Sequence, residues 1–373
     1  MRHDNQLRYA KAIIAEYDGH TPLNLWLKQY FRENKQMGST DRKLLSALVY
    51  GYYRLGHNNF SSLDERLHTA ISIFPDLANY AKNFSHLDTA DFSVDKIFPF
   101  VDALSANIDP VAFSNSFLIQ PSLFLRIRPG KRSAVVHKLE ELALKFEMCG
   151  DECVALPNST KIDELFAINR DVVVQDKSSQ ASGSLLVEAA KHLSTPDLKI
   201  WDCCAASGGK SLMAFDLLKG VDLTVSDKRD NIITNLRSRF REAGITQYHS
   251  FVADITQTPT AIPEGKYDVI IADVPCSGSG TWARTPEQLF FASMNKVDYY
   301  CNLQKSIVKA VMPALKKGGM FVYITCSVFK KENEEVVEFM NLNGMTTIKQ
   351  QVFAGYEEKA DTLFGALLTN SSV

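Results

Sequence analysis

The sequence predicts an α/β protein: a doubly wound, mostly parallel sheet preceded by an all-α region and a small α+β module. Three observations support this prediction. After about residue 173, apolar strand-like runs alternate with helical stretches, which is typical of a parallel sheet covered by helices. Residues up to about 95 have helical periodicity. Between these regions, residues 123–128 alternate with the two-residue period of a strand.

Length and composition limit the class of protein. A chain of 373 residues with 45% hydrophobic and 23% charged residues is expected to form two or three globular domains. The formal net charge of -2 excludes a uniformly basic protein, but a local basic surface is enough to bind nucleic acid. The seven cysteines are odd in number and form no C-x-x-C pair, which argues against a disulfide framework or a zinc ribbon. With no signal-like or membrane-length apolar run, we expect a cytoplasmic protein without a metal site, acting as a monomer.

The first region, residues 1–105, is predicted to be helical. Six apolar residues recur at three-and-four spacing on one helix face: Leu44, Leu45, Leu48, Val49, Tyr52 and Tyr53. Ser39 or Thr40 is the expected N-cap of this helix. Residues 1–60 contain nine Lys/Arg and five Asp/Glu. From charge alone a solvated helical face is the favoured interpretation, and a surface that contacts phosphates is the functional alternative.

The second region, residues 106–172, is predicted to be a small α+β module. A strand at residues 123–128 is followed by a Pro129-Gly130 turn and an amphipathic helix from Val135 to Leu142. Five basic residues occur between the start of this strand and the end of the helix: Arg126, Arg128, Lys131, Arg132 and Lys138. They suggest salt-sensitive docking of RNA, although no aromatic ladder marks the module as a strong single-strand binder.

The third region, residues 173–373, has the clearest pattern. Its five predicted strands are 199–202, 223–227, 251–254, 269–273 and 320–324. Its predicted helices are 210–219, 230–243, 297–315 and 331–341. In open α/β sheets, ligands bind beyond the carboxyl ends of the strands, so the residues at these ends are the candidates for a functional site.

Every predicted strand end carries a Gly-rich turn, a carboxylate or a thiol. The first strand is followed by Cys204-Ala205-Ala206-Ser207-Gly208-Gly209-Lys210. The second and third strands end at Asp227 and Asp254. The fourth ends in Asp273-Val274-Pro275-Cys276-Ser277-Gly278 and the fifth in Thr325-Cys326-Ser327. One such coincidence means little, but five on one edge of a sheet indicate a site.

The Gly-rich turn favours a cofactor of the adenosine type. Glycines at the start of a helix let a ligand approach the backbone. A P-loop would need glycine where Cys204 stands, and the dinucleotide pattern G-x-G-x-x-G is absent. Asp227 lies 18 residues after Gly209, which suits a carboxylate that binds ribose hydroxyls, and Asp254 could contact the adenine edge. Taken singly, either aspartate would more often be a turn or helix-cap residue.

The cysteines suggest a second function at the same edge. A lone cysteine is most often a small buried hydrophobe, which is the expectation for Cys149, Cys153, Cys203 and Cys301. Cys276 and Cys326 lie in polar turns where a thiolate is feasible. Methylation of C5 of cytosine requires a nucleophile that adds to C6, a base, and a carboxylic group near N3. Cys276, Cys326 and Asp273 provide this set, and chemistry alone allows either thiol to be the nucleophile.

These motifs resemble those of the RsmB and Nol/Nop/Sun family of RNA cytosine-C5 methyltransferases. Residues 202–210 (DCCAASGGK) resemble the family's D-x-C-A-A-P-G-G-K motif, and residues 273–278 (DVPCSG) its D-A-P-C-S-G motif. Residues 323–327 (YITCS), followed by Glu332-Asn333-Glu334, and residues 174–180 (VQDKSSQ) resemble two further family segments. Ser207, Val274 and Lys177 depart from the family pattern without removing a ligand or a reacting group.

The resemblance implies a Rossmann-like methyltransferase domain with S-adenosylmethionine as cofactor. It implies that the cofactor is bound by Cys204, Ala205, Ala206, Ser207, Gly208, Gly209, Lys210, Asp227, Asp254 and Asp273. It also implies that Cys326 is the nucleophile, that Cys276 assists product release, and that Asp273 contacts the cytosine.

The resemblance extends more weakly to the two preceding regions. Residues 38–54 resemble the NusB-like RNA-binding domain found at the start of bacterial members, and residues 106–172 resemble the family's RRM-like module. This implies RNA as partner, and small-subunit ribosomal RNA as the substrate. Three alternatives remain: a tRNA cytosine-C5 methyltransferase, a DNA cytosine-C5 methyltransferase, and a non-catalytic RNA-binding ribosome assembly factor. The DNA enzymes use a Pro-Cys thiol as the nucleophile and are not expected to have a second catalytic cysteine at the fifth strand, so Cys326 favours RNA.

Overall fold

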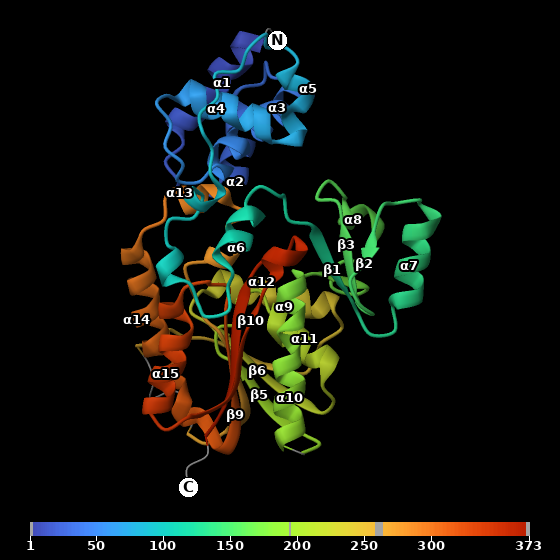
Figure 1. Cartoon of the computed structure of the whole chain (residues 1–373). Helices are drawn as coiled ribbons and strands as arrows, with labels where there is room; N and C mark the ends of the chain where they lie inside the picture. The colour runs from blue at the N-terminus through green and yellow to red at the C-terminus, as the bar shows by residue number, and fades with distance from the viewer. Residues whose placement is uncertain (1–2, 194, 258–263, 371–373) are drawn as a thin grey trace. The chain divides into compact units, whose positions relative to one another are not determined.

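The computed structural model describes residues 3–193, 195–257 and 264–370 (Figure 1). The chain packs into two units. The helical unit contains the chain up to residue 102 together with residues 109–120 and 281–293. The sheet unit contains residues 103–108, 121–280 and 294–373. In the described part of the chain, no helix is long and apolar enough to cross a membrane.

The helical unit confirms the helical periodicity of the first region. Its helices are α1 (His3–Glu16), α2 (Leu23–Glu33), α3 (Ser39–Arg54), α4 (Leu63–Ile73), α5 (Ala78–Ala81), α6 (Pro110–Ser116) and α13 (Pro286–Phe290). On α3, Leu45, Leu48, Val49 and Tyr53 are buried, as the spacing predicted. The N-cap prediction was wrong: Gly38 is the N-cap and makes no side-chain cap bond, because Ser39 is already helical. The NusB-like character of this unit stays a prediction.

Helix α13 comes from the middle of the third predicted region but packs in the helical unit. Glu287 is buried, and its carboxylate accepts a hydrogen bond from the backbone N–H of Leu23 at 3.3 Å. The rings of Phe290 and Tyr53 lie 5.4 Å apart, edge to face. Residues 281–293 thus leave the sheet unit directly after the Cys276 turn. The three predicted domain boundaries stay a prediction.

A small antiparallel sheet forms the second predicted region. Its strands are β1 (Leu123–Ile127), β2 (Glu147–Met148), β3 (Cys153–Leu156) and β4 (Val172–Val174), in the order β2-β3-β1-β4. Helices α7 (Arg132–Glu141) and α8 (Ile162–Leu165) complete a β-α-β-β-α-β sequence, the arrangement of split βαβ folds. Leu125, Val135 and Val154 belong to its core. The strand and helix were predicted; the RRM-like character stays a prediction.

Two of the five basic residues named above, the buried Arg126 and the largely buried Arg128, form ion pairs and do not provide a surface for RNA. Arg126 and Arg128 both bind Asp216, with nitrogen–oxygen distances of 2.6 Å in each pair. The side chains of Arg126 and Asp216 are only 4% and 3% exposed. Charges this deeply buried require a partner, so these arginines attach the small sheet to helix α11 (Gly209–Leu217).

The large sheet has seven strands in the order β10-β11-β9-β8-β5-β6-β7. The strands are β5 (Leu198–Asp202), β6 (Val221–Asp227), β7 (His249–Val252), β8 (Tyr267–Asp273), β9 (Leu315–Thr325), β10 (Thr346–Phe353) and β11 (Leu363–Thr369). Strands β5 to β9 pair in parallel, and β11 is antiparallel to β9. All five predicted strands are present, although β7 ends two residues before Asp254. Strands β10 and β11 were not predicted.

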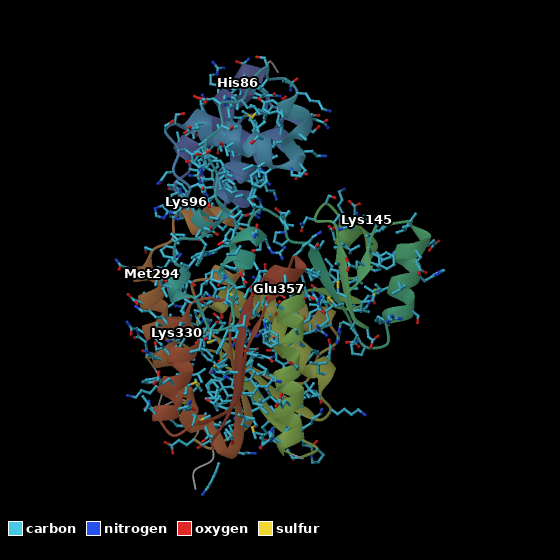
Figure 2. All side chains as sticks on the ribbon, in the orientation of Figure 1. His86, Lys96, Lys145, Met294, Lys330 and Glu357 are labelled. Atoms are coloured by element: carbon cyan, nitrogen blue, oxygen red, sulfur yellow. The ribbon has the colours of Figure 1, made fainter. Side chains whose placement is uncertain are left out.

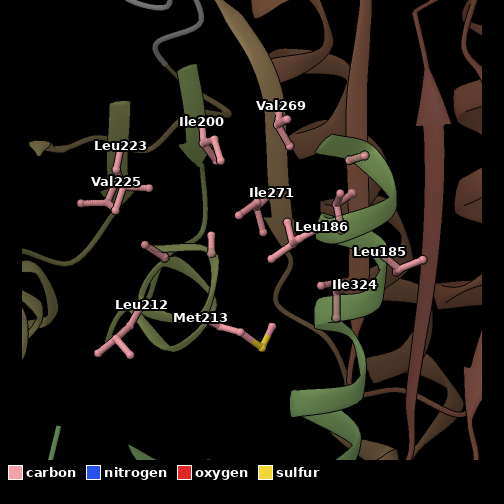
Figure 3. Packing of buried hydrophobic residues seen from close by; sticks show 14 of the residues in the cluster. Leu185, Leu186, Ile200, Leu212, Met213, Leu223, Val225, Val269, Ile271 and Ile324 are labelled. Atoms are coloured by element: carbon pink, nitrogen blue, oxygen red, sulfur yellow. The ribbon is translucent and has the colours of Figure 1, made fainter. Parts of the chain in front are cut away.

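Helices cover both faces of this sheet (Figure 1). They are α9 (Lys177–Ala181), α10 (Gly183–Leu193), α11, α12 (Asp230–Glu242), α14 (Met294–Val311) and α15 (Glu334–Leu342). Side chains of β8 alternate between the faces: Ile271 packs with α10 and α11, as Figure 3 shows, and Ile270 packs with α14 and α15. The doubly wound fold is therefore as predicted, and its parallel strands end at one common edge.

Candidate functional site

The turn between β5 and α11 is fixed by its backbone conformation. Gly208 has a φ of 82° and is the N-cap of α11. A Cβ at this position would lie 2.6 Å from the ring of Phe240, so only glycine fits without a shift. Ala206 also has a positive φ of 45°. Arg239 donates hydrogen bonds to the backbone oxygen and hydroxyl of Ser207 at 3.2 and 3.0 Å, which holds the turn where the family pattern has proline. We call residues 203–209 the cofactor turn.

A pocket of about 460 Å³ lies beside the cofactor turn at the carboxyl ends of β5, β6, β7 and β8. Its lining includes five of the predicted cofactor residues: Cys204, Ala206, Asp227, Asp254 and Asp273. Helix α14 contributes Tyr299, Tyr300, Leu303 and Ile307. The other predicted cofactor residues, Ala205, Ser207, Gly208, Gly209 and Lys210, shape the turn or lie behind it and do not line the pocket.

Asp227 lies at the end of β6 and forms a two-pronged ion pair with Arg229. Nε and Nη2 of Arg229 lie 2.9 and 3.0 Å from its two carboxylate oxygens. Burial alone would raise the pKa of Asp227, but hydrogen bonds from Arg229 and from the backbone of Ala206 lower it below the ordinary value of 3.8. The carboxylate therefore stays ionised and can accept further hydrogen bonds from hydroxyl groups.

Asp254 follows β7 in a turn. Its Oδ1 accepts hydrogen bonds from the backbone N–H of Thr256 at 3.1 Å and from the Thr256 hydroxyl at 2.6 Å. The residue thus has the turn-forming role that is common for aspartate, and it also lines the pocket.

Lys210 is directed to a carboxylate and not to the pocket. Its side chain is 7% exposed, and its Nζ lies 3.1 Å from Oδ2 of Asp273 and 2.7 Å from the hydroxyl of Ser179. Ser179 belongs to the 174–180 segment noted in the sequence. Lys210 therefore fixes Asp273, whose side chain is 34% exposed at the end of β8.

Cys276 and Cys326 come together at the ends of neighbouring strands. Their Sγ atoms lie 3.1 Å apart, and both cysteines are free and partly exposed. The hydrogen bond with Cys326 is the largest cause that raises the pKa of Cys276 well above its ordinary value of 9.0, and burial is the second. Cys276 thus remains a protonated thiol at neutral pH. Cys149, Cys153, Cys203 and Cys301 do not join this pair.

Glu332 connects the two cysteine turns and was not identified as a site residue from the sequence. It is fully buried, and its carboxylate accepts hydrogen bonds from the backbone N–H of Ser277 at 2.7 Å and from the hydroxyls of Ser277 and Ser327. Burial raises the pKa of Glu332 above its ordinary value of 4.5, although these hydrogen bonds oppose the shift. The only signal in the sequence was the Glu332-Asn333-Glu334 segment, which indicated family and gave no role.

Asn333 forms hydrogen bonds with the residues on both sides of Cys326. Its side chain accepts a hydrogen bond from the hydroxyl of Thr325 at 2.5 Å and donates to the backbone oxygen of Ser327 at 2.9 Å. Asn333 therefore fixes both neighbours of Cys326 in the chain. Among the described residues, no group of three or more His, Cys, Asp or Glu could hold a metal ion.

The structures similar to this chain confirm the class of fold. The crystal structure of PH0851 superimposes with a TM-score of 0.73 over 99% of both chains, at 17% identity. The structure of NSun6 from Pyrococcus horikoshii with SFG superimposes with a TM-score of 0.61 over 72% of this chain and 96% of that one, also at 17% identity. These likenesses show that the sheet unit has a Rossmann-like α/β fold.

The sequence comparisons find a similarity to one family over part of the chain. Residues 192–360, which contain the cofactor turn, both cysteines and Glu332, match the model of the 16S rRNA methyltransferase RsmB/F family. The match covers less than half of the chain, and it supports the prediction of S-adenosylmethionine as cofactor.

Two curated relatives are named as small-subunit ribosomal RNA methyltransferases. A probable ribosomal RNA small subunit methyltransferase B of Bacillus subtilis is 28% identical over 225 residues, 59% of this chain and 49% of the relative. A ribosomal RNA small subunit methyltransferase B of Xanthomonas campestris is 30% identical over 169 residues, 45% of this chain and 37% of the relative. The matches thus cover half or less of the relatives' own length.

Proposed function

We propose that this chain transfers a methyl group from S-adenosylmethionine to C5 of a cytosine in RNA, and that this RNA is small-subunit ribosomal RNA. One observation carries the proposal: two cysteine sulfurs lie 3.1 Å apart beside a pocket lined by Asp273. A single thiol is enough for addition to a pyrimidine ring. The second thiol within contact distance supports a reaction that also has to break the sulfur–carbon bond.

The pocket fits a sulfonium nucleoside better than a nucleotide. Three carboxylates, Asp227, Asp254 and Asp273, line its wall together with two cations, Lys228 and Arg229. The acidic groups outnumber the basic ones, which suits a ligand that presents hydroxyls, an amine and a positive charge. Asp227 would accept the ribose hydroxyls, Asp254 would contact the adenine edge, and Leu303 and Ile307 offer apolar surface to a base. The cofactor supplies an electrophilic methyl group when it is bound.

In this proposal the two cysteines have different roles. Cys326 loses its proton to solvent and its Sγ attacks C6 of the cytosine, so that the new C6–S bond makes C5 nucleophilic. After C5 has accepted the methyl group, water takes the proton from C5, the electrons of the C5–H bond restore the C5–C6 double bond, and the C6–S bond breaks. Cys276, whose raised pKa keeps it protonated, donates its proton to the departing sulfur of Cys326 and is reprotonated from solvent. The raised pKa makes Cys276 the poorer nucleophile, which favours Cys326 for the attack.

Asp273 would hold the pyrimidine during the attack. Its carboxyl group would bind the N3 edge of the cytosine, and Lys210 and Ser179 fix its position from the opposite side. The target must be unpaired or turned out of its helix, since C6 is shielded in a stacked duplex.

The substrate is the part of the proposal that depends most on relatives. The curated relatives are named as small-subunit ribosomal RNA methyltransferases, and residues 192–360 match a family model with a similar description. The second cysteine favours RNA over DNA.

Labelled S-adenosylmethionine tests the proposal with the full chain. We expect label in unmodified small-subunit ribosomal RNA and, after digestion to nucleosides, in 5-methylcytidine. Preferential labelling of tRNA or DNA would contradict ribosomal RNA as the substrate. Label in a nucleoside other than 5-methylcytidine would overturn the proposed reaction. No incorporation into any of the three would favour the assembly factor.

A further inference from the structure

A basic groove lies between α2 and α3 of the helical unit, outside the catalytic site. Its volume is about 650 Å³. It is lined by Asn24, Leu27, Lys28, Phe31, Arg32, Arg42, Lys43, Ser46 and Tyr50. Four of these residues are cationic and none is acidic. The groove therefore concentrates positive charge in a protein whose formal net charge is -2.

Three of the four groove cations make no contact that stabilises the fold. In the described part of the chain, Lys28, Arg32 and Lys43 are exposed and form no ion pair or hydrogen bond. Arg42 donates only its Nε, to the backbone oxygen of Met37 at 2.9 Å. The neighbouring carboxylate of Asp41 instead accepts a hydrogen bond from Gln6 at 2.8 Å. Four cations held together without counter-charges raise one another's energy, and an anionic partner relieves that repulsion.

The floor of the groove is apolar. Leu27 and Phe31 are buried with 3% and 8% exposure, and the ring of Tyr50 lies beside them in the lining. Cations along the rim over an aromatic floor are the combination that binds unpaired nucleic acid, with phosphates on the charges and sugars or bases on the rings. In a duplex the bases are paired and stacked inside the helix, so they are not free to contact such a floor.

We propose that this groove binds the sugar–phosphate backbone of an unpaired RNA segment. The choice of RNA over other polyanions rests on the proposed function. The groove lies in the helical unit and the reacting residues lie in the sheet unit, so binding and catalysis can be tested separately.

The test measures binding of the full chain to a fluorescent oligouridine of about 20 nucleotides, titrated at several salt concentrations. This probe contains no cytosine and cannot be methylated under the proposed function. The groove variant is Lys28→Gln/Arg32→Gln/Lys43→Gln. The control variant, Arg8→Gln/Lys82→Gln/Lys96→Gln, removes three exposed cations of the same unit that do not line the groove; Lys96 is labelled in Figure 2.

We expect the groove variant to bind at least about tenfold more weakly near 0.1 M salt, while the control changes by less than about twofold. The slope of log affinity against log salt should fall by about 2, since each lost phosphate contact on a single strand removes about 0.7. Unchanged binding by the groove variant, or no binding by the wild type, would overturn the proposal. Equal competition by polyglutamate would overturn the choice of RNA. A protein that binds oligouridine through the groove but methylates no RNA would refute the proposed function alone.

Discussion

The two halves of the candidate site are built in different ways. The cofactor turn owes its shape to backbone conformation within one short segment, where Gly208 has a positive φ and no room for a Cβ. The cysteine pair owes its geometry to side chains that are distant in sequence, because Glu332 connects the turns after β8 and β9. The cofactor turn can be recognised from a sequence motif because its shape depends on local backbone conformation. The cysteine pair forms only when strands β8 and β9 lie side by side.

This difference predicts that each half can be disabled without the other. Variants of the cysteine half should stop methyl transfer and leave cofactor affinity unchanged. Variants of the cofactor half should weaken cofactor binding and leave the cysteine geometry intact.

Cys326→Ala should have the largest effect. Without the nucleophile, we expect methyl transfer to fall at least about 10³-fold, with cofactor affinity within about twofold of wild type. Transfer of labelled methyl groups and calorimetric titration of the cofactor measure the two quantities. Cys149→Ala, which changes a cysteine outside the pair, serves as the control. Full activity of the Cys326 variant would refute the role of the pair.

Cys276→Ala should distinguish the role of Cys276 from that of Cys326. The attack by Cys326 remains possible but release is slowed, so a covalent protein–RNA adduct should accumulate and migrate slowly on a denaturing gel. The double variant Cys276→Ala/Cys326→Ala should give no adduct. An adduct that forms in Cys326→Ala and not in Cys276→Ala would reverse the two roles.

Glu332→Gln tests whether the buried carboxylate maintains the cysteine geometry. An amide NH2 in place of one oxygen cannot accept the hydrogen bonds from the Ser277 backbone and the two serine hydroxyls together. We expect kcat to fall about 10- to 100-fold and stability to fall by about 1–3 kcal/mol, without a change in cofactor affinity.

A loss of stability alone would mean a merely structural role for Glu332. The kcat of the folded variant, measured well below its unfolding temperature, decides between these outcomes. Glu338→Gln, on the exposed side of α15, is the matched control.

Asp227→Asn tests the cofactor half. Loss of the charge should weaken cofactor binding about tenfold, corresponding to about 1.4 kcal/mol, because hydrogen bonds to a charged acceptor are stronger than those to a neutral one. The adduct in a Cys276→Ala background should still form. Asp222→Asn, at the exposed start of the same strand, is the control. Unchanged affinity would exclude Asp227 from the pocket's binding role.

Asp202→Asn should have the smallest effect on methyl transfer. It tests how the free energy of unfolding depends on pH. Burial is the largest cause that raises the pKa of Asp202 from 3.8 to about 7. A raised pKa means that this group's contribution to stability is complete below pH 3.8 and is lost as the pH rises towards about 7. The free energy of unfolding of wild type, relative to the variant, should therefore decrease over this interval. Urea unfolding at several pH values measures it, and a constant difference would contradict the assignment.

The sequence by itself determined the five parallel strands and the residues that follow them at their carboxyl ends, because the apolar periodicity and the Gly-rich turn are local features. It did not determine β10 and β11, whose partly exposed or uniformly apolar residues have no clear alternation. It gave Lys210 as a cofactor ligand, and only the fold placed that side chain against Asp273.

The basic residues show most plainly what the sequence alone does not determine. Arg126 and Lys28 are equivalent in a count of basic residues, yet Arg126 is buried against Asp216 and Lys28 is exposed at the edge of a groove. The Arg126–Asp216 ion pair, the Ser277–Glu332 hydrogen bond and the 3.1 Å approach of the two sulfurs each join residues 50 or more positions apart. Such contacts arise from packing between distant segments, so the tertiary structure alone decided them.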